Sequence, residues 1–496
     1  MGAGAPIRRR IAILLALIVA GCAPARIDST PAGDSLDAIE RELEADIAVL
    51  ASDDFEGRRP GTAGEAKTLR HLAQEWQEAG LESGTNDPAN PWFVPVSLQL
   101  DQPDRSTATF HRGRRTIAVP EGSVHLYTSG RRALLERSPV LYVGRQGESL
   151  DRSELAGRVA LMAWDHPRHL EQREALIEKG AAAVLAIVPD AADLAELVER
   201  RAEGSYRLAG AEDGAALYGL ISAEGAQALL GERRAAELRA AADREGFRPV
   251  PLDIEAELEA TSLPGEVRTH NLIARLPGSK PGSGAVLLLA HWDHFGRCAG
   301  GEGARAICNG AVDNASGLAV LSAVARRLTR GPRLDRDVYF LATTAEEWGL
   351  LGARAFAQDP PLPLDAIVAA FNVDTSAIAP RGGPVALVGN GMTALDAEVE
   401  RVIAAAGREP GDPEYANRYV RRQDGWALLQ HDVPTLMVSS AFADHEALEA
   451  FMRDRYHRPS DVAGGVELGG AAEDVLLHVA LVRHFANVAS YPAGAR

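Results

Sequence analysis

The chain has 496 residues, a length that accommodates about three domains of ordinary size. Apolar residues make up 46% of it and charged residues 24%, a balance that excludes a disordered, collagen-like or disulfide-framework protein. Acidic residues outnumber basic ones by 69 to 52, and the formal net charge is −17. Because binding to phosphate backbones needs clustered lysines and arginines, this charge argues against a nucleic acid partner.

The first 21 residues have the composition of an export signal. Three arginines at 8–10 precede an apolar stretch over 11–20, which is about half the length that a membrane-spanning helix needs. The stretch ends in Val-Ala-Gly-Cys, which resembles the lipobox of bacterial lipoproteins. The resemblance implies a signal peptide over 1–21, acylation of Cys22 and a flexible tether over 22–35. The alternative is an ordinary signal peptide followed by an unrelated cysteine.

The predicted anchor sets the expected location. Removal of residues 1–21 deletes three arginines and no acidic residue, so the net charge becomes −20. Ala23 follows the cysteine in place of aspartate, which in Gram-negative lipoproteins favours the outer membrane. No second apolar run is long enough to span a membrane. We expect a protein of the bacterial cell envelope, facing the periplasm or the cell surface and held there by its lipid; its oligomeric state is left open.

Residues 36–118 are predicted to form the first part of the main domain. Apolar residues recur at helical spacing over 36–50, and a second helix is predicted over 65–79. Alternating apolar and polar residues then predict strands near 94–100 and 106–110.

Residues 119–261 differ in character and are predicted to form an inserted domain. Short apolar strands at 140–143 and 159–163 are followed by a helix over 172–179, a Gly-Ala turn and a strand over 184–188. This order resembles a protease-associated (PA) domain; the alternative is a generic α/β insertion.

Residues 262–496 alternate between strands and helices. Four nearly continuous apolar runs predict strands buried on both faces, at 285–290, 338–342, 367–373 and 435–439. Helical segments are predicted at 315–328, 348–356, 394–406 and 473–488. This alternation predicts an α/β fold, a three-layer sandwich with a mostly parallel central sheet that the smaller α/β insertion interrupts.

Two cysteines besides Cys22 occur in the chain, Cys298 and Cys308. In an exported protein such a pair can be oxidised to a disulfide, and the alternative is two free thiols.

Candidate metal ligands stand at the carboxyl ends of the predicted strands, where open α/β sheets build their sites. His291 and Asp293 follow the first strand. His291 is the expected ligand and Asp293 the acceptor for its other ring nitrogen, because residues i and i+2 of an extended chain share a side. Asp313 opens a predicted helix, so it is also a candidate helix cap. His294 is expected to be a structural or surface residue.

The remaining candidates come from three later segments. Glu346 and Glu347 follow the second strand, Asp374 ends the third, and His457 lies in a late loop. Two adjacent carboxylates leaving a buried strand are costly unless they are paired or bound to metal. Histidine and carboxylate ligands without thiolate suit zinc or a similar ion. The set is too large for one tetrahedral ion with an open position, and it fits two ions that share a carboxylate and activate a bridging water.

Together with earlier motifs, these segments resemble the M28 family of zinc peptidases, which includes co-catalytic aminopeptidases and often carries an inserted PA domain. The motifs are Leu-Ala-Ser-Asp at 50–53, Phe-Glu-Gly-Arg at 55–58, Pro-Gly-Thr at 60–62 and Gly-Glu at 64–65, followed by the five metal segments in the order of the family. The resemblance covers most of the mature chain, and it implies the fold of the zinc-dependent exopeptidases.

The resemblance also implies roles for single residues. His291 and Asp374 would bind one Zn²⁺, Glu347 and His457 the other, and Asp313 would bridge the two. Glu346 would be the general base, with Asp293 behind the site. A cis peptide bond is implied after the bridging aspartate.

The expected function is that of an exported, lipid-anchored aminopeptidase acting on peptides with two zinc ions. One segment departs from the family: where Ser-Asp-His and then Phe are usual, this chain has Gln423-Asp424-Gly425 and then Leu428, which puts the substrate preference in doubt. The alternatives are a carboxypeptidase of the same family, a glutaminyl-peptide cyclase-like acyl transferase with a single zinc, and a binding ectodomain without catalysis.

Overall fold

The computed structural model describes residues 1–2, 35–145, 149–165, 169–210, 216–242, 244, 246–298 and 307–492. Apart from the first two residues, the predicted signal peptide lies outside the described residues, and so do Cys22 and the tether as far as residue 34. None of the helices in these ranges combines the length and the apolar character needed to cross a bilayer.

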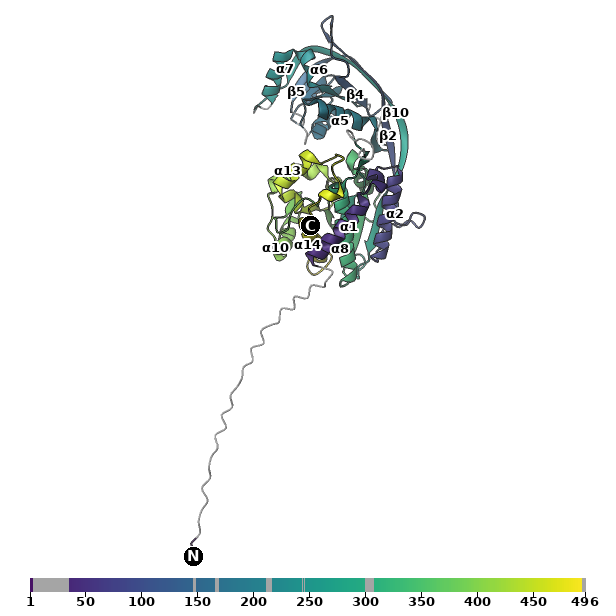
Figure 1. The fold of residues 1–496 in the computed structure, drawn as a ribbon, viewed down its shortest axis with the longest axis vertical. Coiled ribbons are helices and arrows are strands. Elements are labelled where there is room, and N and C mark those ends of the chain that lie inside the picture. Colours follow the sequence, from purple (N-terminus) through teal and green to yellow (C-terminus); the bar gives the residue numbers. More distant parts are fainter. Residues whose placement is uncertain are drawn as a thin grey trace.

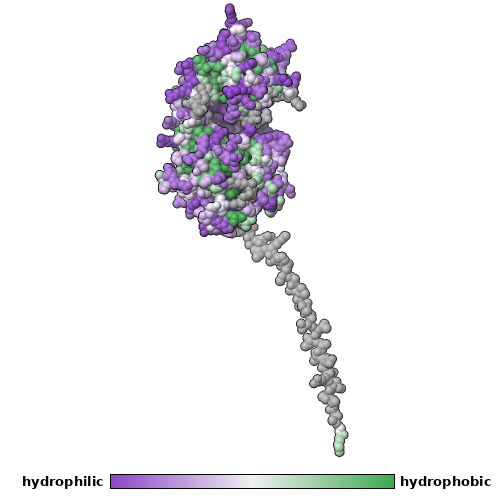
Figure 2. Space-filling view, turned by 180° about the vertical axis from the view of Figure 1, so that it is seen from behind, coloured by the Kyte–Doolittle hydropathy of each residue, from purple (hydrophilic) through white to green (hydrophobic). Residues whose placement is uncertain are grey.

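The described residues form two lobes that long strands connect (Figure 1). One lobe holds α1, α2, α8, α10, α13 and α14, and the other holds β4, β5, α5, α6 and α7. Strands β2 and β10 run along one side of both lobes. Figure 2 shows that hydrophilic residues predominate on one face, with apolar residues in small separate groups.

The helices and strands up to the second long strand are the following: α1 Leu36–Leu50, α2 Ala63–Glu78, β1 Glu82–Ser83, β2 Phe93–Arg112, β3 Arg115–Ile117, β4 Val124–Thr128, β5 Arg132–Gly144, α3 Arg152–Leu155, β6 Val159–Ala163, α4 His169–Glu178, β7 Ala183–Val188, α5 Ala191–Ala202, β8 Ser205–Leu208, β9 Leu217–Ser222, α6 Ala223–Leu230, α7 Glu232–Ala242 and β10 Val250–Leu276.

The elements after it are β11 Ala285–His291, β12 Gly296–Arg297, β13 Ile307–Cys308, α8 Ser316–Arg330, β14 Asp337–Thr343, α9 Leu351–Gln358, β15 Ile367–Asn372, β16 Ala386–Val388, α10 Asp396–Ala405, α11 Pro413–Ala416, α12 Gly425–Leu429, β17 Thr435–Ser439, α13 His445–Asp454 and α14 Gly469–Phe485.

Within the described ranges, one continuous sheet of 15 strands runs through both lobes. Its main path has the order β16-β17-β15-β11-β14-β10-β5-β6-β7-β9-β4. Strands β17, β15, β11 and β14 are parallel, and β16 and β10 flank them antiparallel. Strands β5, β6, β7 and β9 form a second parallel group. The predicted α/β class with a mostly parallel central sheet is confirmed.

Alternate residues of β11 face two helical layers. Val286, Leu288 and Ala290 belong to the core cluster that includes α1, α8 and α14. Leu287 and Leu289 belong to the cluster on the other side, which includes residues of α9 and α12. A strand between two helical layers has no polar face, which is why the predicted strands are continuous apolar runs.

The long strands differ from the expectation of separate short ones. Strand β2 continues through Pro103, where the sequence predicts a break between two strands. Pro103 pairs beside a register shift between Thr261 and Ser262 of β10, and a bulge tolerates the missing N–H of proline. Strand β10 runs through residues 261 and 262, the end of the predicted insertion, so the two lobes share this strand. The domain boundaries themselves stay a prediction.

Candidate metal centre

The predicted ligands gather at the carboxyl ends of the parallel strands. His291 is the last residue of β11, and Asp374 follows β15. Glu346 and Glu347 lie in a short helical turn, Glu346–Trp348, after β14. Parallel strands end at one edge of a sheet, so residues distant in sequence are brought together there.

The carboxylate of Asp313 lies at the centre of the cluster. Its Oδ1 is 3.2 Å from Nε2 of His291, and its Oδ2 is 3.3 Å from Nε2 of His457. Asp374 lies 3.6 Å from the first histidine, and Glu347 lies 2.9 Å from the second. The cluster therefore has two halves that share one carboxylate. The peptide bond between Asp313 and Asn314 is cis, as the resemblance implies.

One ring nitrogen of each histidine in this part of the structure lacks a hydrogen-bond partner. Nε2 of His291, His294 and His457 is buried and accepts or donates no hydrogen bond among the described residues. Each unpartnered nitrogen costs free energy unless something binds it. Nitrogen and carboxylate donors facing one point are the ligand set of zinc and similar divalent ions, so the residues present fit such ions.

The charges of the cluster are strongly coupled. Burial raises the pKa of Asp313, but the nearby rings of His291 and His457 outweigh burial and hold that pKa well below its ordinary value. For Glu346, burial is the largest cause and raises the pKa well above its ordinary value, and the neighbouring Glu347 adds to this. Among the described residues, the carboxylate of Glu346 takes part in no hydrogen bond, and Nε2 of His291 lies 3.9 Å away. The environment of Glu346 therefore favours acceptance of a proton, and its carboxylate also lines the cavity beside the cluster.

Asp293 holds the turn that carries the two glutamates. Its carboxylate accepts hydrogen bonds from the backbone N–H groups of Glu346, at 3.0 Å, and Glu347, at 3.4 Å. The expectation that this carboxylate orients His291 differs from the structure: the backbone carbonyl of Asp293 lies 3.1 Å from Nδ1 of His291, and the carboxylate 3.8 Å. The reason is that β11 ends at His291, so the alternation of an extended chain stops there.

His294 is closer to the centre than the sequence predicts. Its ring is fully buried, and Nδ1 lies 2.5 Å from Oε1 of Glu347. With Asp313 and Glu347 it forms a second group of donors that could hold an ion. The only signal in the sequence is its place in the His-Trp-Asp-His loop.

The loops that carry the ligands are tied together from behind. Asp461 accepts hydrogen bonds from the backbone N–H groups of Val312 and Asp313, at 3.1 Å each. Arg58 is completely buried and donates to the carbonyls of Trp292 at 2.9 Å and Gly310 at 2.9 Å. It also donates to the carbonyls of two further residues, Leu50 and Asn309. The Phe-Glu-Gly-Arg motif thus fastens the N-terminal segment to the ligand loops.

We predict that Arg58→Met destabilises the protein by about 3–5 kcal/mol, because it leaves four buried carbonyls without their donor. The melting temperature should fall by roughly 5–10 °C, measured by circular dichroism. Arg70→Met changes an exposed arginine of α2 and should melt like the wild type. Equal melting temperatures for the two variants would contradict this role of Arg58.

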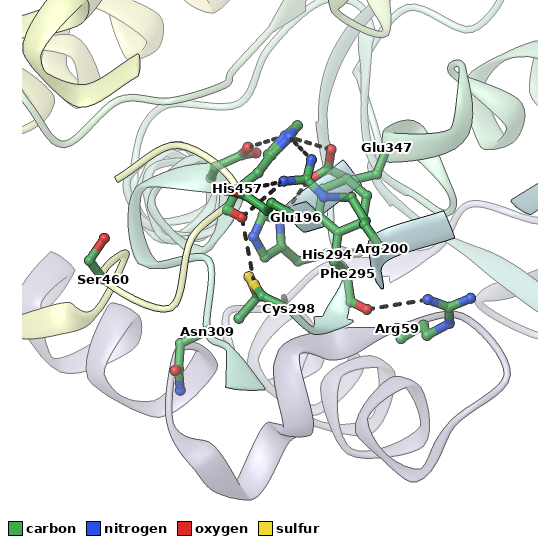
Figure 3. Close-up of a disulfide and its surroundings, with 12 residues drawn as sticks. Arg59, Glu196, Arg200, His294, Phe295, Cys298, Asn309, Glu347, His457 and Ser460 are labelled. Atoms are coloured by element: carbon green, nitrogen blue, oxygen red, sulfur yellow. Dashed lines mark hydrogen bonds and ion pairs between the residues drawn. A yellow bond between two sulfur atoms is a disulfide. The ribbon is translucent and has the colours of Figure 1, made fainter. Parts of the chain in front are cut away.

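A disulfide and an arginine of the other lobe flank His457 (Figure 3). Cys298 and Cys308 form the disulfide, with their Cα atoms 5.4 Å apart, and Sγ of Cys298 lies 3.6 Å from the carbonyl of His457. Arg200 of α5 reaches across from the other lobe to within 3.2 Å of Nδ1 of His457. It is held by Glu196, at 2.6 Å, and lies over the ring of Phe295.

A cavity opens beside the two-part cluster. It provides about 420 Å³ of space that is open to solvent, and Glu346 and Asp374 line it. Gln423, in the segment that departs from the pattern of the resembled family, also lines the cavity. Asp424 is buried next to it and accepts a hydrogen bond from Thr343. Burial raises the pKa of Asp424 to about 6.

The sequence model described as peptidase family M28 matches residues 271–473, the segment that contains every predicted metal ligand. Residues 271–473 belong to peptidase family M28. The resemblance found in the motifs is confirmed, and with it the prediction that the chain is an enzyme of the peptidase class.

Solved structures with this architecture include M28-type enzymes. An aminopeptidase from Aneurinibacillus sp. strain AM-1 has 16% identity and a TM-score of 0.55, over 90% of this chain and 93% of that one. BSAP, a zinc aminopeptidase from Bacillus subtilis, has 17% identity and a TM-score of 0.49, over 92% and 97%. A glutaminyl cyclase from Fimbriiglobus ruber has 13% identity and a TM-score of 0.41, over 93% and 99%. The search of curated proteins gave no match.

Proposed function

We propose that this M28 enzyme is an aminopeptidase that works with two zinc ions. The observation that carries the proposal is the carboxylate of Asp313, whose two oxygens face His291 and His457 separately. The two halves would each hold one ion, with Asp374 in the first half and Glu347 in the second. The Aneurinibacillus structure, whose fold is similar, is that of an aminopeptidase.

The chemistry follows from the positions of the side chains. Zinc ions held here would supply an activated water and polarise the scissile carbonyl. Glu346, with its raised pKa, accepts the proton of the water and delivers it to the leaving amine. Asp293 fixes the backbone of the turn, so that the carboxylate of Glu346 faces the cavity.

The cavity suits a large apolar side chain at the end of a peptide. Met437, Phe442 and Leu448 are buried residues of its wall, and Tyr419 adds an aromatic ring. Burial of such a side chain contributes roughly 1.5–3 kcal/mol. We propose a preference for leucine, methionine or phenylalanine as the terminal residue.

The test uses zinc-loaded protein with leucine p-nitroanilide, N-acetylleucine p-nitroanilide and a peptide with N-terminal glutamine. An aminopeptidase hydrolyses the first substrate and not the acetylated one. Release of ammonia from the glutamine peptide without hydrolysis of the anilide would identify a cyclase and overturn the proposal. Binding without turnover of any of them would identify an ectodomain without catalysis.

The position of Arg422 favours the alternative function, that of a carboxypeptidase. Its guanidinium lines the cavity and donates to the hydroxyl of Tyr456 at 3.2 Å. Among the described residues it has no carboxylate within ion-pair distance, so it is available to a substrate carboxylate. If the enzyme is a carboxypeptidase, Arg422→Met should abolish cleavage of an N-acetylated dipeptide with a free C-terminus. An enzyme that never cleaves this dipeptide is not a carboxypeptidase.

We also propose that the enzyme is exported and attached to the outer membrane through acylated Cys22. The support is the lipobox-like end of the predicted signal peptide. Cys22→Ser should move the protein from the membrane fraction to the soluble fraction of the periplasm. Retention of this variant in the membrane fraction would contradict the proposal.

A further inference from the structure

A second cavity lies in the lobe that carries α5, outside the matched M28 segment. It lies between β4, α4, α5 and β9, and its space of about 410 Å³ is partly open to solvent. Its apolar lining includes Met162, Val184 and Leu197. The basic residues of its lining are Arg173, Arg201 and His169, and among the residues that the structure describes no acidic one lines it.

Two guanidinium groups face the same aromatic ring in this cavity. Arg173 lies 4.6 Å from the centroid of the Tyr218 ring, and Arg201 lies 5.3 Å from it. Arg201 also donates to the hydroxyl of Tyr218 at 3.1 Å. Burial and the nearby charge of Arg201 lower the pKa of Arg173. Like charges that interact in a partly buried site are unfavourable unless an anion compensates them.

The described protein supplies little compensating negative charge. Within the described part of the chain, Arg173 forms one ion pair, with Glu174 at 3.8 Å, and the side chain of Glu174 is 62% exposed. Such an exposed, long pair contributes little. No ion pair of Arg201 occurs among the described residues. The two arginines therefore retain donors for a ligand.

A buried hydroxyl points to a ligand independently. Tyr127 is 7% exposed, and its hydroxyl has no hydrogen-bond partner among the described residues. The same ring lies 5.8 Å from the guanidinium of Arg201. An unpartnered buried hydroxyl costs free energy, and a ligand oxygen that accepts its proton would remove that cost.

We propose that this cavity binds an organic carboxylate, with the carboxylate between Arg173 and Arg201, the hydroxyl of Tyr127 donating to it, and the apolar part of the ligand against Met162, Val184 and Leu197. Planar guanidinium groups match carboxylates in geometry, and the apolar wall favours an attached hydrocarbon or aromatic group over a free inorganic anion. The ligand class is thus an apolar amino acid or peptide end with a free carboxylate.

The position of the cavity links it to the metal centre. Arg201 lines the cavity, and the preceding residue of α5, Arg200, contacts Nδ1 of His457. A carboxylate that binds Arg201 therefore acts on the same turn of helix that touches the metal centre. Two sources of the carboxylate are compatible with this: the far end of a peptide substrate, and a free carboxylate that binds as an effector.

The first test is direct binding of N-acetyl-L-phenylalanine to the full-length protein, measured by isothermal titration calorimetry. The acetyl group removes the free amine that an aminopeptidase site would hold. We expect binding by the wild type, about tenfold or greater weakening in Tyr127→Phe, and loss of binding in Arg173→Gln/Arg201→Gln. Tyr127→Phe removes only an unpartnered hydroxyl, so it should fold like the wild type, and unchanged affinity in it would count against the site.

Two controls decide the ligand class. N-acetyl-L-phenylalaninamide lacks the carboxylate and should not bind, and sodium sulfate should compete weakly. Equal binding of the amide, or full competition by sulfate at equal concentration, would overturn the assignment. So would binding by the double arginine variant, because the carboxylate would then lie at the metal centre. None of these outcomes depends on turnover, so they are separate from the proposed function.

Kinetics distinguish the two sources. If the cavity holds the far end of the substrate, peptides with a free C-terminus have a lower KM than their C-terminal amides, and the double variant removes the difference. If it holds a free effector, N-acetyl-L-phenylalanine changes the turnover of leucine p-nitroanilide in the wild type and not in the double variant.

Discussion

Glu346→Gln should retain both metal ions and lose about 10²–10⁴-fold in kcat, the contribution of a general base. Glutamine has the size of glutamate, and the carboxylate of Glu346 lies 3.9 Å from Nε2 of His291, beyond hydrogen-bond distance. The metal ligands should therefore keep their places in the variant. The amide cannot take up the proton that the raised pKa of Glu346 lets the carboxylate accept. The measurement is kcat on leucine p-nitroanilide together with zinc content by mass spectrometry of the same sample.

Glu224→Gln is the matched control, because Glu224 is an exposed glutamate of α6. It should have wild-type kcat and zinc content. Wild-type turnover in Glu346→Gln would assign the base to another residue. Loss of zinc in Glu346→Gln would instead make Glu346 a ligand.

Asp313→Asn should have the largest effect on metal binding. An amide has one oxygen and no charge. It therefore cannot offer one oxygen to each half of the cluster, the half with His291 and the half with His457, as the carboxylate does. We expect the loss of at least one of the two ions at micromolar zinc and a decrease in kcat/KM of about 10³-fold or more. Zinc content after gel filtration, and kcat/KM at saturating zinc, are the two measurements.

Asp359→Asn is the control for the loss of an acidic charge, since Asp359 is exposed beyond the end of α9. Circular dichroism of Asp313→Asn shows whether the variant is folded. A folded Asp313→Asn protein with two tightly bound ions would contradict a bridging role, because each half would then be complete without this carboxylate.

Local patterns predicted the elements of the M28 part well. The helix predicted over 36–50 is α1, since its apolar residues recur at helical spacing and pack on one face. The predicted strands 338–342 and 435–439 lie in β14 and β17. The predicted helix 348–356 begins later, at Leu351, because a short turn and Gly349 with a positive φ come first. Periodicity reports burial on each element and does not reveal such a turn.

Local sequence patterns did not predict which distant strands pair with each other. Strands β2 and β10 cross both lobes, whereas the sequence predicts two short strands near 94–100 and 106–110, separated by the segment that contains Pro103. Proline is acceptable there because β2 bulges, with one extra residue between the partners of Thr261 and Ser262 in β10. The end of the inserted domain was predicted to lie at residue 261. The sequence therefore did not predict that one sheet continues through both lobes.

In the candidate site, the metal ligands could be predicted from the sequence, whereas the hydrogen bonds that hold their loops could not. His291, Glu347 and Asp374 stand at strand ends, which a reader of the sequence can recognise. The hydrogen bonds from Arg58 to Trp292, Asn309 and Gly310 span more than 230 positions along the chain, so no local pattern reveals them. His294 has an ambiguous signal, because a buried histidine next to a ligand is also common as a packing residue.

The most direct measurement of the central claim is anomalous X-ray diffraction at the zinc edge from crystals of the zinc-loaded enzyme. The account predicts two peaks about 3.5–4 Å apart, one beside His291 and Asp374 and one beside His457 and Glu347, with the carboxylate of Asp313 between them. A single peak at this place, or none at saturating zinc, would contradict the two-metal centre.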